Sequence, residues 1–513
     1  MIPTLTEKVE KITSFQLGWH RDQIRPQVNI TNCFVYLRTF ILTKGMTKLS
    51  TPTYKLTKLQ ANSLTPTDIY RKLTGKKKFL LESTFPHERK GKYSFIGANP
   101  YEEIIGYHDK TTVINHDSHS QEVITQNALI YLKNHLPKLD FPIPLPFYGG
   151  AVGYTGYDAI RQFEDIGETL PDDRNMPDIH FMLFQNIIVY DHNSDAIYLI
   201  TINIKDEAEI VLDKRLEKLK KSIERKGSNK VPNNASMNFT PEISKEAFME
   251  NVNKAKEHIQ KGDIFQVVLS QRLVADVEGD AFLFYQKLRE ANPSPYMFYI
   301  DFKDYLLLGA SPESLVQTQG DEIITNPIAG TRVRGKTAQE DLALMKELLE
   351  DEKEIAEHKM LVDLSRNDLG RVCETGTISI PTYMTIEKYQ HVMHIVSEVK
   401  GKLKANYSSI DALISCLPAG TVSGAPKIRA MQIINELEEK KRGAYAGGIG
   451  FINFNHDINI ALAIRSLIVK DNKAYLQAGA GIVFDSNPET EYEETLNKAR
   501  SLMEVDKYDF VNG

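Results

Sequence analysis

The sequence predicts an α+β fold whose sheets are largely antiparallel. Between about Phe79 and Ile204, short runs rich in β-branched and aromatic residues, such as NIIVY and AIYLITINI, alternate with turn residues, as is typical of antiparallel strands. Strands and helices then alternate irregularly through Arg500. The third observation is an amphipathic helix followed at once by a strand. Because regular strand–helix–strand spacing is missing, these patterns favour α+β over a doubly wound parallel sheet.

The helix is predicted from the spacing of apolar residues. Between Phe248 and Ile259 they recur at intervals of four, three and four residues, which places them on one helix face, and Gly262 supplies a C-terminal stop. The strand IFQVVLSQR follows, and alternate side chains of a strand share a face. Gln266 and Ser270 therefore point the same way, so one face of this strand can carry polar chemistry.

Three segments are predicted along the 513 residues. Residues 1–45 are weakly periodic and form an N-terminal extension to which the sequence assigns no role. Residues 46–235 form an N-terminal domain and residues 236–513 a C-terminal domain. The boundary follows from the polar stretch 221–241, which loses its apolar periodicity and is typical of a helix end and an exposed connector.

Composition excludes several classes of protein. The formal charge of -6 comes without a long basic run, so binding to nucleic acid is not expected. No apolar stretch is long enough to span a membrane, and the first residues do not resemble a secretory signal. Cys33, Cys373 and Cys416 lie far apart without CxxC spacing, which argues against a disulfide framework or a zinc ribbon. We therefore expect a cytoplasmic protein.

Two short segments each place two glutamates three residues apart. They are Glu354 and Glu357 in EKEIAEH, and Glu491 and Glu494 in ETEYEET. On helices each pair projects from one face, and two converging helices would supply the oxygen ligands that Mg²⁺ prefers. The alternative for either pair alone is a solvated acidic helix face, because glutamate is abundant on helix surfaces.

Three further features are candidates for substrate chemistry. The glycine-rich QAGAGIV at Gln477–Val483 permits close approach of the backbone to a ligand, and its free amides could bind a carboxylate. His394 lies among apolar residues, as either an acid–base group or a structural histidine. Arg465 interrupts the apolar run ALAIRSLIV and needs an anionic partner there, either a bound dicarboxylate or an internal glutamate. The GxGxxG and phosphate-loop patterns are missing, which disfavours a nucleotide cofactor.

The order of these segments resembles that of the chorismate-utilising enzymes and, within them, the component I chains of anthranilate synthase, over residues 65–505. An ordered set of motifs is far more specific than any one of them. The resemblance implies antiparallel sheets packed as a sandwich with outer helices. The shared motifs are LLES at 80–83, NPSPYMF at 292–298, GASPESL at 309–315, PIAGT at 327–331, LVDLSRNDLGRVC at 361–373, and then HVMHIVS, GTVSGAPK and QAGAG.

The resemblance implies a Mg²⁺-dependent lyase that aminates chorismate and eliminates pyruvate to give anthranilate for tryptophan synthesis. Water-using relatives carry a lysine base where this chain has Gln266, which argues against hydration. Aminodeoxychorismate synthases of folate synthesis often carry a lysine nucleophile where this chain has Ala329, and alanine cannot attack carbon. Some of them lack that lysine, so this activity stays the first alternative. A non-catalytic tryptophan-sensing subunit is the second.

The resemblance also implies a role for each site residue. Glu313 handles the proton of the leaving C4 hydroxyl, unless it is an ordinary exposed loop acid. The implied catalytic residues are His394, Glu313, Thr421 and Lys498; by spacing alone, Thr421 could instead be a helix cap and Lys498 an exposed ion pair. The implied substrate-binding residues are Gly330, Thr331, Tyr445, Arg465, Gly479, Ala480 and Gly481. The implied metal ligands are Glu357 and Glu494 directly, with Glu354 and Glu491 in support or through water.

Two binding partners besides chorismate are implied. L-tryptophan, as an inhibitor, would meet a carboxylate and a hydroxyl from LLES and an apolar surface for its ring, unless these residues are ordinary packing. The implied tryptophan-binding residues are Glu82, Ser83, Asn292, Pro293, Ser294, Pro295, Tyr296, Met297, Ile449 and Phe451. None of the three cysteines has the glycine-flanked setting of a glutaminase nucleophile. A separate glutamine amidotransferase small subunit is therefore expected to supply ammonia.

Overall fold

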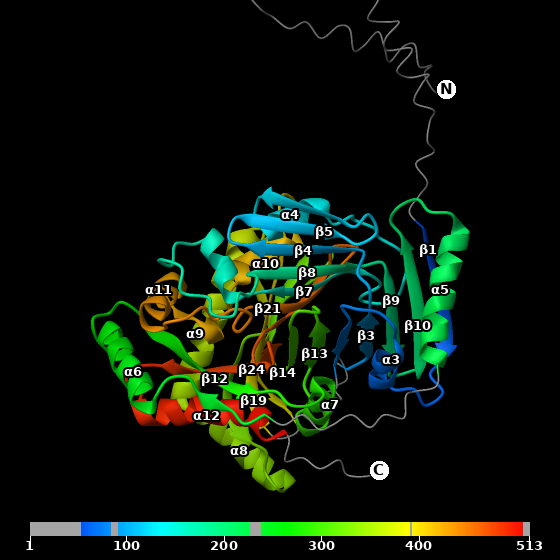
Figure 1. Cartoon of the computed structure of the whole chain (residues 1–513). Helices are drawn as coiled ribbons and strands as arrows, with labels where there is room; N and C mark the ends of the chain where they lie inside the picture. The colour runs from blue at the N-terminus through cyan, green and yellow to red at the C-terminus, as the bar shows by residue number, and fades with distance from the viewer. Residues whose placement is uncertain (1–52, 84–90, 226–236, 390–391, 506–513) are drawn as a thin grey trace, which may run out of the picture. The chain divides into compact units, whose positions relative to one another are not determined.

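The computed structural model describes residues 53–83, 91–225, 237–389 and 392–505 (Figure 1). The predicted extension at residues 1–45 and the centre of the predicted connector lie outside the described residues. Pro52–Gly513 forms one unit by its internal contacts. Within the described ranges, no helix combines the length and the apolar character needed to cross a membrane.

The described strands form two antiparallel sheets. The first runs, in spatial order, β1 (Thr53–Gln60), β10 (Ala196–Asn203), β9 (Asn186–Asp191), β3 (Tyr93–Gly97), β2 (Phe79–Glu82), β13 (Tyr296–Asp301), β14 (Leu306–Ser311), β23 (Ser466–Lys470), β24 (Lys473–Ile482), β12 (Gln266–Asp276) and β11 (Thr240–Pro241), with β20 (Gly424–Ala425) also on β12. The second runs β17 (Ile328–Val333), β19 (Val392–Lys402), β16 (Glu322–Thr325), β15 (Ser314–Gln319), β22 (Ile458–Leu462), β21 (Gly448–Asn453), β7 (Gly150–Thr155), β8 (Ile179–Phe184), β4 (Glu102–Tyr107), β5 (Lys110–Asn115) and β6 (Ser120–Thr125), with β18 (Ser379–Lys388) also on β19.

Both sheets combine strands from the two predicted domains. In the first sheet, β2 pairs with β13, and in the second, β7 pairs with β21. The apolar residues of these strands therefore enter shared cores. The boundary near residue 235 between the two predicted domains stays a prediction.

Aromatic side chains pack between the two sheets. The ring of Phe79 in the first sheet lies 4.8 Å from that of Phe184 in the second, and Phe95 contacts Phe451 across the same interface at 5.5 Å. These rings are buried, and large aromatic side chains contribute much of the apolar area that stabilises a core. Together with the helices outside the sheets, this packing confirms the predicted α+β sandwich.

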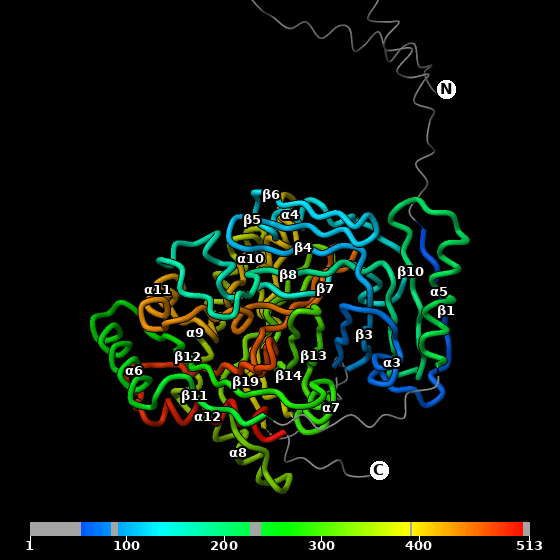
Figure 2. The backbone as a smooth tube through the Cα atoms, viewed as in Figure 1, coloured from blue at the N-terminus to red at the C-terminus, as the bar shows by residue number. Residues whose placement is uncertain are grey.

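The helices cover the outer faces and one end of the sheets (Figures 1 and 2). The predicted amphipathic helix is α6, which begins after the capping hydroxyl of Ser244, and Gly262 beyond its end has a φ of 81°. Figure 2 shows α6 beside the C-terminal helix α12, and the two pack together. The helices are α3 (Pro66–Lys72), α4 (Ala128–His135), η1 (Tyr157–Gln162), α5 (Glu209–Glu224), α6 (Lys245–Gln260), α7 (Ala281–Ala291), α8 (Ala338–Glu350), α9 (Glu352–Val372), α10 (Ser409–Cys416), η2 (Gly420–Val422), α11 (Lys427–Leu437) and α12 (Pro488–Met503).

Candidate active site

Glu313 is a buried acid beside two other predicted residues. It lies in the connection between β14 and β15, is 7% exposed, and accepts a hydrogen bond at 2.8 Å from the Thr421 hydroxyl of η2. Burial raises the pKa of Glu313 to about 8, although the Thr421 hydrogen bond and the charge of Lys498 act to lower it. The side chain is therefore protonated at neutral pH and can donate a proton. The exposed-loop alternative does not hold.

His394 is oriented by two polar groups of β17. It lies opposite Thr331 where β19 pairs with β17, and its Nδ1 is 2.9 Å from the Gly330 carbonyl and 3.1 Å from the Thr331 hydroxyl. A carbonyl only accepts, so the bond to Gly330 puts the hydrogen on Nδ1 and leaves the lone pair of Nε2 free. Burial lowers the pKa of His394, the Gly330 bond acts to raise it, and the charge of Arg465 acts to lower it.

Gly330 brings the backbone of β17 close to both His394 and the first glutamate pair. Its φ of 69° lies in the left-handed region that favours glycine, and the pairing of β17 with β19 shifts register there. A Cβ at Gly330 would lie only 3.2 Å from an oxygen of Glu354. The residues predicted to line the substrate ring and one of the predicted metal ligands are therefore neighbours.

Arg465 is a partly buried cation in an unusual backbone conformation. Its φ is 50°, and its guanidinium donates to the Lys498 carbonyl at 2.6 Å and to the Ser501 hydroxyl at 3.3 Å. Within the described ranges no carboxylate forms an ion pair with it. Burial lowers the pKa of Arg465, while Tyr445 and Glu494 act to raise it. Glu494, an internal glutamate, therefore acts on Arg465 electrostatically without an ion pair, and the guanidinium can still take a bound anion.

The glycine-rich segment forms the end of β24 and has one unpaired edge. Pairing with β23 stops at Leu476, whereas pairing with β12 continues to Ile482. Lys498 reaches this edge and donates to the Gly479 carbonyl at 3.0 Å. A Cβ at Gly479 would lie 2.9 Å from the Tyr445 hydroxyl, and one at Gly481 would lie 2.7 Å from the amide nitrogen of Gln266. The glycines thus keep space beside these groups; Ala480 between them is buried in the core.

The four predicted metal ligands flank this strand as two pairs. On α9, Glu357 accepts a hydrogen bond at 3.0 Å from Gln266. On α12, Glu494 forms an ion pair with Lys498 at 2.6 Å, and Glu491 is 6% exposed. Burial raises the pKa of Glu354, and the neighbouring Glu357 adds to that effect. Burial raises the pKa of Glu491 as well, against a hydrogen bond from Ser486.

The two pairs do not form one preformed cluster. Among the described residues, no three histidine, cysteine, aspartate or glutamate side chains are grouped so that they could hold a metal ion. Lysine side chains offset the negative charge of these carboxylates instead. Lys498 forms an ion pair with Glu494, and Lys353 on α9 lowers the pKa of Glu491 on α12. Mg²⁺ is commonly bound by one or two carboxylates together with water and substrate oxygens, so these residues fit that ion.

Comparison with known proteins decides the family. Residues 76–504 match the family model of chorismate binding enzymes. Anthranilate synthase component 1 of Lactococcus lactis is 44% identical over 459 residues, which cover 88% of this chain and 99% of that protein. Anthranilate synthase component 1 of Acetivibrio thermocellus is 46% identical over 447 residues, which cover 83% of this chain and 89% of that protein. The crystal structure of anthranilate synthase component I from Streptococcus pneumoniae has a TM-score of 0.75 at 40% identity, covering 87% and 99%. The chain belongs to the anthranilate synthase component 1 family.

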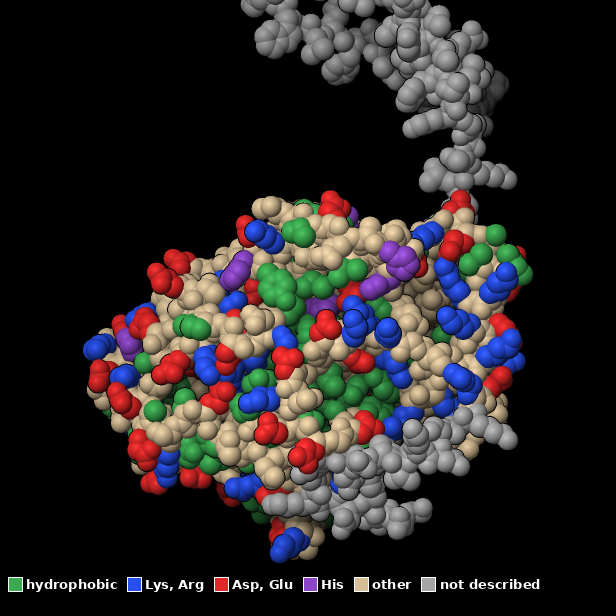
Figure 3. All heavy atoms as spheres, viewed as in Figure 1, with side chains coloured by type: hydrophobic (Ala, Val, Ile, Leu, Met, Phe, Trp, Pro, Cys, Tyr) green, Lys and Arg blue, Asp and Glu red, His purple; other side chains and the backbone are tan. Residues whose placement is uncertain are grey.

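In this component 1 chain, most of the predicted tryptophan-binding residues line one cavity between the sheets. The cavity measures about 90 Å³, and Figure 3 shows hydrophobic side chains gathered in a hollow over β13. Of the predicted residues, its lining includes Glu82, Ser83, Pro295, Tyr296, Met297, Ile449 and Phe451. Asn292, Pro293 and Ser294 are not part of the lining. Asn292 instead donates to the Ser501 carbonyl at 2.8 Å, and Ser294 donates to the Ser311 carbonyl at 2.6 Å.

Two buried oxygens in the same cavity have no hydrogen-bond partner in the described structure, namely the Ser83 hydroxyl and the Asn459 side-chain carbonyl. Glu82 is already engaged, because Tyr285 donates to it at 2.7 Å and Arg289 at 2.9 Å. Asn459 is not among the residues predicted from the sequence. Its signal was a single polar residue in the apolar strand β22, the same kind of signal that identified Arg465.

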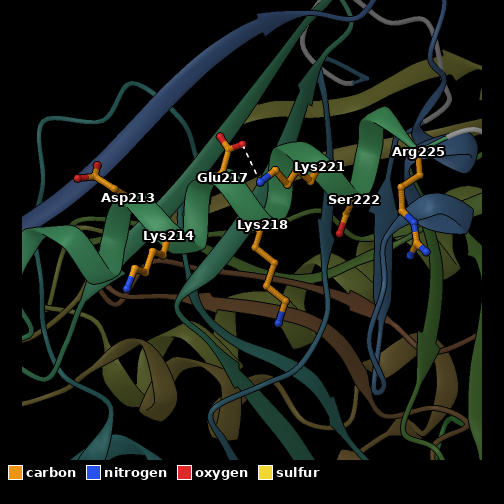
Figure 4. A pocket seen from close by; sticks show the side chains of 7 residues that line it. All are labelled: Asp213, Lys214, Glu217, Lys218, Lys221, Ser222 and Arg225. Carbon is orange, nitrogen blue, oxygen red and sulfur yellow. Dashed lines mark ion pairs between the residues drawn. The ribbon is translucent and has the colours of Figure 1, made fainter.

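A separate groove follows the outer side of α5 in this component 1 chain (Figure 4). Lys214, Lys218 and Arg225 point to one side of the helix, while Glu217 turns the other way and pairs with Lys221 at 3.3 Å. None of the predicted site residues lines this groove. Its charges are those of a solvated helix face, and such exposed pairs contribute little to stability.

Proposed function

We propose that this chain is the large subunit of anthranilate synthase and converts chorismate and ammonia into anthranilate and pyruvate in tryptophan biosynthesis. One observation carries the proposal: in a chain 44% identical to an anthranilate synthase component 1, the charge of Arg465 acts on the pKa of His394, and Lys498, to whose carbonyl Arg465 donates, acts on the pKa of the buried acid Glu313. The reaction needs an acid, a base and an anion-binding group.

Substrate orientation falls to the groups around β24. Chorismate carries two carboxylates, and its enolpyruvyl carboxylate would lie between Arg465, the Tyr445 hydroxyl and the unpaired edge at Gly479–Gly481. Burial raises the pKa of Tyr445 to about 12, so its hydroxyl stays a hydrogen-bond donor at neutral pH. Gly330 and Thr331 would then line the ring and hold it beside His394.

Amination uses Glu313 as the acid. The C4 hydroxyl is a poor leaving group, and a proton from Glu313 lets it depart as water while ammonia bonds to C2. Thr421 keeps the carboxyl in place through its hydrogen bond. In the second step the free Nε2 of His394 removes the proton from C2, and the bond from the ring to the enolpyruvyl oxygen breaks. Enolpyruvate departs and takes up a proton at its methylene carbon to become pyruvate. Aromatisation of the ring makes this step favourable.

Magnesium would be held by Glu357 and Glu494 directly and by Glu354 and Glu491 through water. When bound, the ion supplies a Lewis acid and a template at the ring carboxylate. Lys498 now pairs with Glu494, and Gln266 donates a hydrogen bond to Glu357, so these two carboxylates would exchange those partners for the ion.

Glu357→Gln is therefore expected to raise the Mg²⁺ concentration for half-maximal activity by about tenfold. The measurement is a Mg²⁺ titration of ammonia-dependent anthranilate formation, accompanied by calorimetry of Mg²⁺ binding in the presence of chorismate. Glu352→Gln, an exposed position at the start of the same helix, is the control and should titrate like the wild type. An unaltered titration of Glu357→Gln would remove this residue from the set of ligands.

A glutaminase chain would supply the ammonia. Little ammonia is unprotonated at neutral pH, and Cys373 and Cys416 are buried, with burial raising the pKa of Cys373 to about 11 and that of Cys416 to about 12. Neither is a reactive thiolate, as a glutaminase requires. The relatives' name, component 1, implies a component 2. Glutamine-dependent activity is expected only after that chain is added.

The proposed activity is tested by incubating the purified chain with chorismate, MgCl₂ and ammonium sulfate. Fluorescent anthranilate together with pyruvate is the expected result. An aminodeoxychorismate product would favour the folate-pathway alternative, against which Ala329 argues. The absence of any turnover would point to a subunit that only senses tryptophan.

Tryptophan would inhibit the enzyme from the cavity lined by Ser83 and Asn459. We expect Asn459→Leu to raise the tryptophan concentration for half-inhibition by about tenfold, because a buried oxygen that accepts an N–H of the ligand is lost. The measurement is inhibition of ammonia-dependent activity, with kcat in the absence of tryptophan as the internal control. If half-inhibition stayed at the wild-type concentration, Asn459 would not contact the inhibitor.

A further inference from the structure

A small polar chamber lies next to Glu313. It measures about 30 Å³, enough for one or two water molecules. Glu313 and Thr421, which are hydrogen-bonded to each other, both line it, so the acid faces this chamber. The remaining polar lining comes from Ser314, Thr325, Asn326, Ser365 and Asp368.

The Thr325 hydroxyl indicates that the chamber binds water. Thr325 is 5% exposed at the end of β16, and its Oγ1 has no hydrogen-bond partner among the described residues. Buried hydroxyls in native proteins almost always have a partner, and an ordered water is the usual one when no protein group is in reach. Because Thr325 and Glu313 line the same chamber, a water molecule bound there would be a partner for this hydroxyl next to the acid.

Residues of α9 line one side of the chamber and include the charged residue Asp368. Leu361, Ser365 and Asp368 follow one another at spacings of four and three, which places them on one helix face. Both carboxylate oxygens of Asp368 accept hydrogen bonds from Lys427, at 2.7 and 2.6 Å. The side chains of this pair are 13% and 10% exposed, so the pair is largely buried and keeps a small area of contact with solvent.

We propose that water in this chamber returns a proton to Glu313 after each amination, with Thr325 holding the water and the Asp368–Lys427 pair linking it to solvent. The role rests on the proposed function, in which Glu313 is the acid. Glu313 gives one proton to the C4 oxygen, the C4–O bond breaks and water leaves. The nitrogen that bonds to C2 sheds one proton to solvent. One proton therefore has to reach Glu313 from solvent, and the chamber supplies a path while the intermediate still occupies the other side.

Thr325→Val removes the hydroxyl and little else. We expect kcat of ammonia-dependent anthranilate formation to fall about tenfold, with KM for chorismate unchanged and a larger solvent deuterium isotope effect, since acid–base steps respond on this scale. Thr325→Ser should restore the wild-type values. The matched control is Thr155→Val, because the Thr155 hydroxyl on β7 is also buried without a partner but does not line the chamber.

Two results would overturn the proposal. One is a kcat and an isotope effect of Thr325→Val equal to those of Thr155→Val. The other is a high-resolution crystal structure of the wild type without ordered water between Thr325 and Glu313, a measurement that does not depend on activity. A wild-type chain that forms no anthranilate contradicts the proposed function itself, and the crystallographic result then decides on the chamber alone.

Discussion

Glu313→Gln is expected to lower kcat of ammonia-dependent anthranilate formation by about 10³-fold and to leave KM for chorismate near its wild-type value. Glutamine keeps the shape and can still accept the hydrogen bond from Thr421, but it has no proton to give to the C4 oxygen. The loss should therefore appear in kcat. Steady-state kinetics with ammonium sulfate measures it, and Glu322→Gln, whose side chain is 47% exposed, is the control.

The same substitution should stabilise the fold at alkaline pH. The pKa of Glu313 is about 8 in the folded chain, against an ordinary value of 4.5, so the folded state holds its proton where the unfolded state has lost it. The folded state then binds more protons, and stability falls as pH rises from about 4.5 to about 8. Glu313→Gln removes this dependence. At pH 8.5 the variant should melt above the wild type, and a lower melting temperature would contradict a neutral buried acid.

Candidate site residues were predictable where one polar residue broke a local apolar pattern. Arg465 interrupts ALAIRSLIV and His394 interrupts HVMHIVSEV, and both lie at the candidate site. The helix α6 was predictable for the same local reason, because spacing along one segment fixes which residues share a face. Asn459 is also a single polar residue in an apolar strand. The local sequence around such an amide does not show whether it contacts a ligand or only packs in the core.

The pairing of distant segments was not predictable from local patterns. β12 pairs with β24 across about 200 residues of sequence, and this pairing brings Gln266 beside Gly481 and Glu357. The spacing of four residues between Glu494 and Lys498 predicted that they could form an ion pair. Spacing alone could not show whether this ion pair lies on an ordinary exposed surface or beside a binding site. Only the meeting of several strands and helices makes that distinction.

His394→Ala is expected to separate the two halves of the reaction. Without Nε2 to remove the C2 proton, formation of anthranilate and pyruvate should fall by about 10³-fold, while consumption of chorismate should fall by less than about tenfold. The aminated intermediate would then accumulate and be released, and mass spectrometry of the quenched reaction would detect it. His456→Ala is a matched control, because His456 also bonds a backbone carbonyl and burial also lowers its pKa.

The pH dependence gives this prediction a second test. Burial lowers the pKa of His394 below its ordinary 6.5, so the neutral base persists as pH falls through that value, and the elimination step should lose rate only in more acidic solution. Amination depends on the acid form of Glu313 and should lose rate in the opposite direction, as pH rises through about 8. The two steps therefore overlap at neutral pH, where both groups are uncharged. Pyruvate elimination by His394→Ala at the wild-type single-turnover rate would assign the base to another residue.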